Sequence, residues 1–528
     1  MAVELYSSGV LVSSATELSS TTIVSGGSMI ITAPGVATDI IVSSGGVLLL
    51  YNDAVANGVE VMSGGVAHVL WGGEISGITA NSGANIYISS GGTAVEIYES
   101  GGCVYVSSGA TANFVSHTIN DFVISPSKSA TLHSGTTANS TIVSGNRNSG
   151  YAYLYVYDGG IANATQVGNY AYLYVYSGGT INDTIFNGNY VLYVSSGGYA
   201  SNTTLNYYGT MNVYGSAEDT VVGPGYFSVY KGGIASGIIV NSGGYAYISS
   251  GGTASSTVIN SYGWGAIYSG GSAEDTTVNY GGTLIISNLG TATAIKENGG
   301  YVSVANGASV TYASNYISGL EMSLSGRNMT VHSGTTATAI TVNSGYVYIY
   351  SGGIISQTFI NSMGGLSISS GGTASGISVA EGGGLQFYIT SDTYVQGDYN
   401  GSSFETAAGT LSGYTIHSSG GINVNEGGAA EDITVDAYAY LNVSSGGTAL
   451  AVRENGGYVG VTDGAEVTFT ANSFNDVVLS YGRSATLHSG TTANSTIVSG
   501  YHNSGYAYLY VYDGGIAMRI LNTDWIYI

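Results

Sequence analysis

The chain has 528 residues, of which 44% are hydrophobic and 7% charged, and its 31 acidic and 8 basic residues give a formal charge of −23. This composition excludes a disordered chain, and the acidic charge repels the phosphates of nucleic acids and of anionic lipids. The longest apolar runs, such as 47–51, are far too short to span a bilayer. We therefore expect a folded protein that neither binds nucleic acid nor inserts directly into a membrane.

A Gly-Gly pair recurs with a period of 19 residues along much of the chain. Pairs begin at Gly159, Gly178 and Gly197, and the same spacing returns from Gly232 to Gly251. A fixed period near twenty residues is typical of stacked repeat units, each of which contacts only its neighbours. The sequence therefore predicts one elongated repeat body instead of several globular domains.

A short strand is predicted before each Gly-Gly pair. In 151–157, apolar residues alternate with tyrosines, and a period of two indicates a strand. When coils are aligned on the glycines, the apolar positions fall into two columns, and we expect these side chains to stack in a buried core: Leu154, Leu173 and Leu192, then Val156, Val175 and Val194.

A second strand is predicted after each pair. It reads Gly-Gly-x-Ala-x-x-Thr-x-apolar-Asn, and its apolar column includes Val167, Phe186 and Leu205. Asn187 and Asn206 follow that column, and stacked asparagines can hydrogen-bond from one coil to the next. The glycines supply positive φ and omit a Cβ where the chain turns between the strands.

These features predict an all-β fold, a right-handed parallel β-helix of about 19-residue coils with almost no helix. We divide the chain into four segments. Residues 1–385 form a repeat solenoid, and residues 386–412, which lack a Gly-Gly pair, form an irregular insertion or a distorted coil. Residues 413–517 continue the same solenoid, and residues 518–528 form a non-repeat C-terminal tail.

No catalytic, cofactor-binding or metal site emerges from the sequence. The eight basic residues are dispersed, whereas a polysaccharide-cleaving site needs acids and a base in one groove. A recurrent module carries a glutamate followed by His-Ser-Gly-Thr-Thr-Ala, and these histidines are too far apart to bind one metal: His133, His332 and His488. We expect them to be structural or exposed, and we expect the single cysteine, Cys103, to be buried.

Tyrosine is enriched, with 46 Tyr against 9 Phe. The tyrosines of 151–193 alternate with the core residues, so they face outward, where they offer rigid amphipathic contact area. A purely structural role, in which the rings stiffen the strands by stacking, is an open alternative. The candidate adhesive surface comprises Tyr153, Tyr155, Tyr157, Tyr172, Tyr174, Tyr176 and Tyr193.

The repeat resembles the passenger repeats of AIDA-type self-associating autotransporter adhesins. Val-Ser-Ser-Gly-Gly-x-Ala-x-x-Thr-x-apolar-Asn occurs at 194–206, and with isoleucine first at 248–260. The resemblance covers most of the chain, and it implies a β-helix at the bacterial cell surface or outside the cell that mediates adhesion, autoaggregation and biofilm formation. Neither an export leader nor a membrane-anchoring segment is recognisable, so three alternatives stay open: a passenger fragment, a truncated gene product, or export by another route.

The resemblance also implies serine O-heptosylation by a dedicated heptosyltransferase. Carried onto this chain, the candidate acceptors are the serine pairs before the glycines, although each is also a common turn residue: Ser43, Ser44, Ser89, Ser90, Ser195, Ser196, Ser249, Ser250, Ser369, Ser370, Ser444 and Ser445.

The leading hypothesis is a non-enzymatic adhesin whose partners are a second copy of the chain and host or bacterial surface glycans or proteins. Two alternatives stay open: a β-helix carbohydrate-active enzyme, and a passive spacer or matrix fibre.

Overall fold

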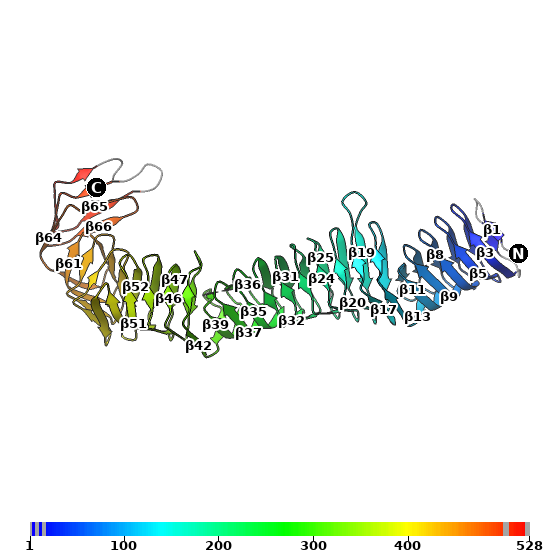
Figure 1. Cartoon of the computed structure of the whole chain (residues 1–528), viewed down its shortest axis with the longest axis horizontal. Helices are drawn as coiled ribbons and strands as arrows, with labels where there is room; N and C mark the ends of the chain where they lie inside the picture. The colour runs from blue at the N-terminus through cyan, green and yellow to red at the C-terminus, as the bar shows by residue number, and fades with distance from the viewer. Residues whose placement is uncertain (1–2, 6–9, 13–16, 500–505, 523–528) are drawn as a thin grey trace. The chain divides into compact units, whose positions relative to one another are not determined.

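The fold is taken from a computed structural model of the chain, which describes residues 3–5, 10–12, 17–499 and 506–522. Throughout these residues every regular element is a β-strand and none is a helix. Coils of about 19 residues lie on one another as a parallel β-solenoid (Figure 1). The predicted all-β solenoid is confirmed.

In the described part of the chain, no helix is long and apolar enough to cross a membrane.

The chain divides into two compact units, and each unit consists of three segments of the chain. Unit 1 consists of Met1–Thr276, Leu284–Thr293 and Ser303–Val310. Unit 2 consists of Thr277–Thr283, Ala294–Val302 and Thr311–Ile528. Each unit is a stack of coils with its own apolar interior.

The interior of unit 1 is built by in-register columns of aliphatic side chains. Strands β19 (Ala152–Val156), β22 (Ala171–Val175) and β25 (Val191–Val194) pair in parallel, with Leu154 opposite Leu173 and Leu173 opposite Leu192. All three leucines are fully buried, and burial of one such side chain contributes about 1.5–3 kcal/mol. Both predicted columns are confirmed.

The two glycines of a pair have different tasks. Gly178 has a φ of 77°, which lies in the left-handed region that glycine adopts without a steric penalty. A Cβ added to Gly179 would lie 2.5 Å from the carbonyl oxygen of Val156 in the coil before. The first glycine therefore makes the turn, and the second lets successive coils approach.

The predicted second strand is divided into two short strands in these coils. β20 (Ile161–Asn163) and β21 (Gln166–Val167) are separated by Ala164, whose φ is 50°. The left-handed residue turns the chain at a corner, after which Thr165 and Val167 are buried. The continuous pattern of 161–167 did not reveal this corner, because the residue there is an ordinary alanine.

The ladders are interrupted where the coil rhythm changes. In unit 1, the sheet of β10 (Asn85–Ile88) and β12 (Cys103–Val106) ends at β12, and another sheet begins at β16 (Ser129–Leu132). In unit 2, one sheet ends at β62 (Tyr458–Val461), before β66 (Ser484–Leu487). We call residues 99–133, 297–332 and 454–488 the first, second and third junctions.

Segment 386–412 contains antiparallel pairing. β53 (Tyr394–Tyr399) pairs in parallel with β51 (Thr373–Val379) and antiparallel with β54 (Ser402–Ala407). β54 pairs antiparallel with β55 (Thr410–Ser412), which returns to parallel pairing with β58 (Ala429–Glu431). One reversed strand is thus inserted within the stack. Of the tail 518–528, residues 523–528 lie outside the described residues.

Candidate functional site

The seven predicted tyrosines lie together on the outer face of β19, β22 and β25. The ring centroids of Tyr155 and Tyr174 are 5.3 Å apart, and those of Tyr174 and Tyr193 are 5.1 Å apart. Tyr157 stacks on Tyr176 at 4.7 Å. Each of the seven rings is half-buried, because its neighbours cover its faces. We call this surface the tyrosine face: Tyr153, Tyr155, Tyr157, Tyr172, Tyr174, Tyr176 and Tyr193.

The tyrosine face is uncharged around neutral pH. Burial raises the pKa of Tyr155 to about 12, and the neighbouring hydroxyls of Tyr174 and Tyr176 act in the same direction. Burial and the neighbouring Tyr176 also raise the pKa of Tyr157 to about 12. The face therefore presents protonated hydroxyls, which donate and accept hydrogen bonds, above flat apolar rings.

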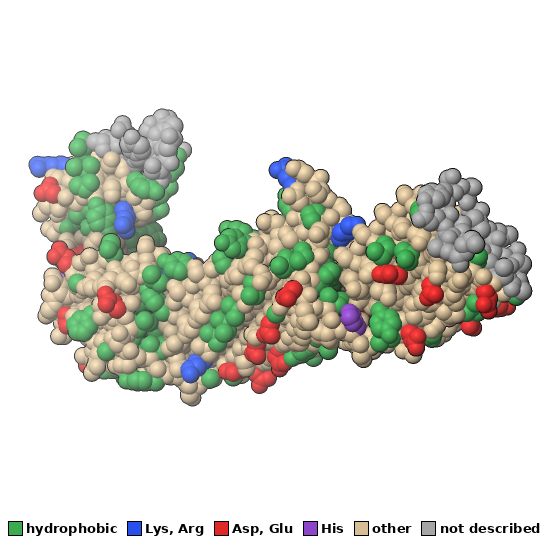
Figure 2. Space-filling model, turned by 45° about the vertical axis from the view of Figure 1, so that its right-hand side comes forward, with side chains coloured by type: hydrophobic (Ala, Val, Ile, Leu, Met, Phe, Trp, Pro, Cys, Tyr) green, Lys and Arg blue, Asp and Glu red, His purple; other side chains and the backbone are tan. Residues whose placement is uncertain are grey.

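The surface of the chain seen in Figure 2 is mostly uncharged. In the view of Figure 2, uncharged polar side chains and backbone dominate, acidic side chains lie scattered among them, and basic side chains are few. Such a surface suits contacts made by hydrogen bonds and ring stacking better than contacts made by ion pairs.

The predicted serines occupy tight turns between strands. The Ser43 amide donates to the carbonyl of Ile23 at 2.9 Å, and the Gly46 amide donates to the carbonyl of Ser43 at 2.9 Å. In every one of the predicted turns the first serine is half-buried and the second is exposed. The exposed second serines are Ser44, Ser90, Ser196, Ser250, Ser370 and Ser445.

Asparagine ladders run along the outside of the coils. Asn260 donates to Asn241 at 2.8 Å, and the amides of Asn206 and Asn187 lie 3.5 Å apart, as the repeat predicted. A second ladder was missed: each side-chain amide donates to the residue one coil earlier, at 2.9–3.0 Å, along Asn120, Asn139, Asn163 and Asn182. Its signal is the recurrence of Asn directly after each inward Ala or Ile, and the longer spacing between Asn139 and Asn163 masks that recurrence.

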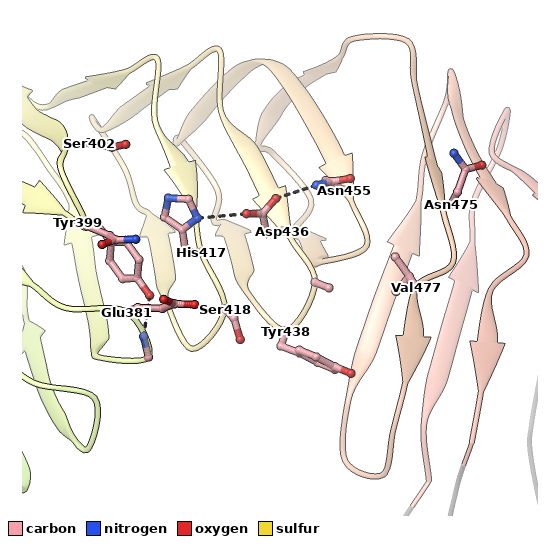
Figure 3. Close-up of a pocket in the computed structure, with 13 residues that line it drawn as sticks. Glu381, Tyr399, Ser402, His417, Ser418, Asp436, Tyr438, Asn455, Asn475 and Val477 are labelled. Atoms are coloured by element: carbon pink, nitrogen blue, oxygen red, sulfur yellow. Dashed lines mark hydrogen bonds and ion pairs between the residues drawn. The ribbon is translucent and has the colours of Figure 1, made fainter.

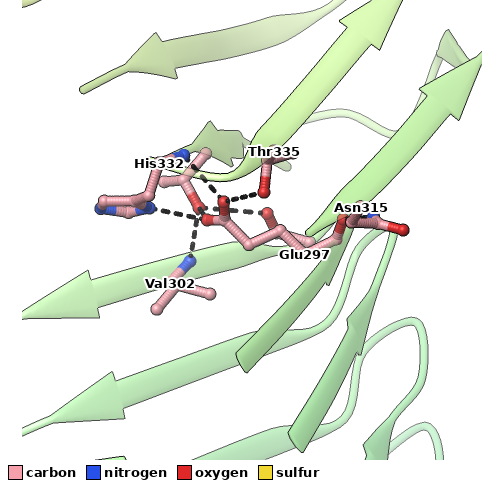
Figure 4. A network of polar contacts seen from close by, with 7 residues as sticks. Glu297, Val302, Asn315, His332 and Thr335 are labelled. Atoms are coloured by element: carbon pink, nitrogen blue, oxygen red, sulfur yellow. Dashed lines mark hydrogen bonds and ion pairs between the residues drawn. The ribbon is translucent and has the colours of Figure 1, made fainter. Parts of the chain in front are cut away.

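Each junction contains a fully buried glutamate that accepts several hydrogen bonds. Figure 4 shows Glu297 of the second junction, whose Oε1 accepts from the Thr330 hydroxyl at 2.5 Å and from His332 Nδ1 at 2.7 Å. Its Oε2 accepts from the His332 backbone amide at 2.8 Å and from the Thr335 hydroxyl at 3.0 Å. Because a buried carboxylate is costly unless it is hydrogen-bonded, this network holds Glu297 against the segment 330–335 within unit 2.

Three of these four contacts recur at the other junctions, where the hydroxyls of Thr136 and Thr491, the counterparts of Thr335, have no hydrogen-bond partner among the described residues. Thr131 donates to Glu99 at 2.7 Å, and Thr486 donates to Glu454 at 2.6 Å. The histidine ring is sandwiched each time: the ring of His332 stacks between Tyr312 and Tyr350 at 4.5 and 4.3 Å. All three glutamates are fully buried, so they are structural groups that a substrate does not reach.

Sequence reasoning missed the partners of these histidines. His133, His332 and His488 were expected to be structural or exposed, and they are largely buried against their glutamates. The signal was available, because glutamate and histidine are separated by 34, 35 and 34 residues in the three modules.

Cys103 is buried, as predicted, and burial raises the pKa of its thiol to about 11. The thiol is therefore protonated and unreactive around neutral pH. Within the described residues, no three His, Cys, Asp or Glu side chains are grouped so as to hold a metal ion.

The chain matches several solved structures. A fragment of TibA, hyper-glycosylated by TibC, is 30% identical to this chain, and the match covers 58% of this chain and 97% of the fragment with a TM-score of 0.31. The alginate lyase AlyGC is 9% identical, covers 94% of this chain and 97% of the lyase, and has a TM-score of 0.13. The tailspike protein of E. coli bacteriophage HK620 is 10% identical, covers 88% of this chain and 73% of the tailspike, and has a TM-score of 0.12.

The identities and TM-scores of the lyase and the tailspike protein are too low to support any inference about this chain. No protein-family model matches the chain, and no curated protein matches it. The sequence identity with TibA extends over nearly the whole of that fragment. The chain therefore belongs to the family of AIDA-type self-associating autotransporter adhesin passengers, which its repeats resemble.

Proposed function

We propose that the chain is a non-enzymatic adhesin of the bacterial cell surface or extracellular space, and that it holds cells together through contacts between copies of its tyrosine face. The observation that carries the proposal is the stack of uncharged rings with outward hydroxyls on β19, β22 and β25. Half-buried rings that already pack on one another lose little conformational entropy when they bind, so they suit repeated weak contacts.

The test uses beads coated with the purified chain. A variant with Tyr155→Ser, Tyr174→Ser and Tyr193→Ser removes one row of the tyrosine face, and we expect bead aggregation to fall. The control is Tyr207→Ser with Tyr208→Ser, because these rings are 69% and 62% exposed and lie outside that face. If the triple variant remains folded and aggregates like the native chain, the adhesive role of the face is wrong and a spacer role is favoured.

We further propose that the serine turns are O-heptosylated by a heptosyltransferase partner, as the hyper-glycosylation of TibA by TibC supports. The exposed second serine of each turn is the expected acceptor, because its hydroxyl is reachable while the first serine is half-buried. Ser370 is expected to be modified least, since its hydroxyl lies 3.2 Å from that of Thr390.

Site-resolved mass spectrometry after co-expression with a heptosyltransferase tests this assignment. Ser44→Ala is expected to abolish the modification of its turn, and Ser43→Ala, the matched control in the same turn, is expected to preserve it. Modification that follows the first serine in most turns would contradict the assignment.

A further inference from the structure

A groove of about 760 Å³ opens on unit 2 where the repeat is most irregular (Figure 3). Tyr399 and Ser402, from β53 and β54, lie at one end of it. His417, Asp436 and Asn455 cross its middle, one from each of three successive coils. Asn475 and Val477, which lie within the third junction, line the other end. The groove thus exists because the reversed strand and the junction both interrupt the regular stack.

The middle of the groove holds a row of connected polar side chains. His417 Nδ1 lies 3.2 Å from Asp436 Oδ2, and Asn455 Nδ2 donates to Asp436 Oδ1 at 2.8 Å. The side chains of His417 and Asp436 are 32% and 29% exposed, so they are held in place and still accessible. These contacts use His417 Nδ1 and Asn455 Nδ2, and a ligand can engage the other polar atoms of the same groups.

This row departs from the repeat at the place where the surface is hollowed. In unit 1 the corresponding column pairs like with like, as in the Asn260–Asn241 contact. In the groove the rungs are histidine, aspartate and asparagine, which together offer donors and acceptors of planar geometry. Such groups recognise neighbouring hydroxyls on a ring, because one planar group can bond two of them.

An aromatic wall borders the row. Tyr438 has a φ of 69°, its hydroxyl donates to the Val478 carbonyl, and the Arg483 guanidinium lies 5.1 Å from its ring centroid. The ring is thereby fixed between this groove and a second hollow of about 360 Å³ that three more tyrosines line: Tyr388, Tyr440 and Tyr458. Rigid rings beside planar polar groups suit a ligand with an apolar C–H face and a hydroxyl edge.

The charged side chains that line the groove indicate which sugars it can bind. Glu381 and Asp436 line the groove, and none of its described lining residues is Lys or Arg. With no Lys or Arg among these lining residues, the two carboxylates repel uronic, sialic or sulfated sugars. The volume lies within the roughly 300–1,000 Å³ typical of ligand sites, which leaves room for a short oligosaccharide.

We infer that the groove is a binding site for neutral oligosaccharides, with His417, Asp436 and Asn455 as its hydrogen-bonding row and Tyr438 as its aromatic wall. The inference deepens the adhesive function proposed above, and rests on it, by giving unit 2 a glycan partner that is separate from self-association through the tyrosine face.

The test is binding of the whole purified chain to an array of neutral glucose-, galactose-, mannose- and N-acetylglucosamine-terminated oligosaccharides, with sialylated and sulfated counterparts. Binding to neutral members alone is expected. Asp436→Ala and Asn455→Ala should each weaken it about tenfold, the effect of losing one good hydrogen bond. The matched control is Asn202→Ala, which removes an exposed amide that donates to Asp183 at 2.6 Å in unit 1; it should bind like the native chain.

A further variant, Ser418→Trp, separates loss of binding from loss of folding. Ser418 is an exposed residue of the groove outside the core, so the indole should block glycan binding and leave thermal melting unchanged. Binding only to anionic glycans, binding to none, or equal binding by all variants would overturn the inference. Bead aggregation of the same variants separates the two proposals: native aggregation without glycan binding refutes the groove alone, and glycan binding without aggregation refutes the tyrosine face alone.

Discussion

Replacement of Glu297 by leucine tests whether buried glutamates hold the junctions together. Leucine has a similar size but no acceptor, so Glu297→Leu leaves the Thr330 and Thr335 hydroxyls and the backbone amide and Nδ1 of His332 without their acceptor. The hydroxyls can rotate toward other acceptors, as Thr330 can toward the Gly300 carbonyl, but the two His332 donors cannot; each donor left unpaired costs about 1–3 kcal/mol, or about 2–6 kcal/mol for these two. Relief from burying a charge offsets part of this, and we expect a net loss of about 3 kcal/mol.

Hydrogen exchange measured by mass spectrometry reads this loss locally. A loss of about 3 kcal/mol should speed exchange of the amides in 329–338 roughly 150-fold under conditions where local opening limits exchange. Glu297→Gln should give a smaller effect, because its one carbonyl oxygen still accepts while its NH₂ faces other donors. The control is Glu426→Ala, which removes an exposed glutamate of the same unit. Native protection in Glu297→Leu would refute the assigned role.

Three further changes follow from the same geometry. Burial raises the pKa of Tyr155 and Tyr157 from 10.0 to about 12, so their contribution to stability is complete below pH 10 and is lost as the pH rises through about 12. Tyrosinate absorbance, followed together with unfolding, should show this loss of stability in the same pH range. Unfolding that does not depend on tyrosinate formation would contradict the prediction. Leu173→Ala should lower the free energy of unfolding by about 2–5 kcal/mol in urea denaturation, and a loss below about 1 kcal/mol would argue against a dry interior. Gly178→Ala should cost more than Gly427→Ala in thermal melting, because both have positive φ near 77° but only at Gly178 does the new Cβ meet another residue. It displaces the Asp158 carboxylate and lies 3.0 Å from the Asp158 Cα, so equal costs would contradict the close stacking of turns.

The features of the fold that recur every 19 residues were predicted from the sequence. Leu154, Leu173 and Leu192 stack because coils of equal length place equal positions over one another, and this physics is visible in the spacing itself. The roles of Gly178 and Gly179 followed in the same way, since a turn between strands needs positive φ and close approach.

Features that arise from departures from the period were not predicted. The corner at Ala164 was not predicted, because alanine does not favour positive φ, although the equivalent corner residues Asp183 and Asn202 do. The reversed strand β54 required pairing partners that the absence of a Gly-Gly pair in 386–412 does not specify. The groove depends on both that strand and the third junction, so no pattern in the sequence pairs His417 with Asp436, which are neighbours in the fold.

In-register stacking is the claim from which the tyrosine face, the asparagine ladders and the serine turns all follow, and paired cysteines test it most directly. Tyr155 and Tyr174 are aligned partners on adjacent strands, and strands about 4.8 Å apart place two cysteines within disulfide reach. Oxidation of Tyr155→Cys with Tyr174→Cys, followed by thiol titration under denaturing conditions, should leave only Cys103 reactive. The shifted pair Tyr153→Cys with Tyr176→Cys should remain reduced, and equal oxidation of the two pairs would contradict the 19-residue register.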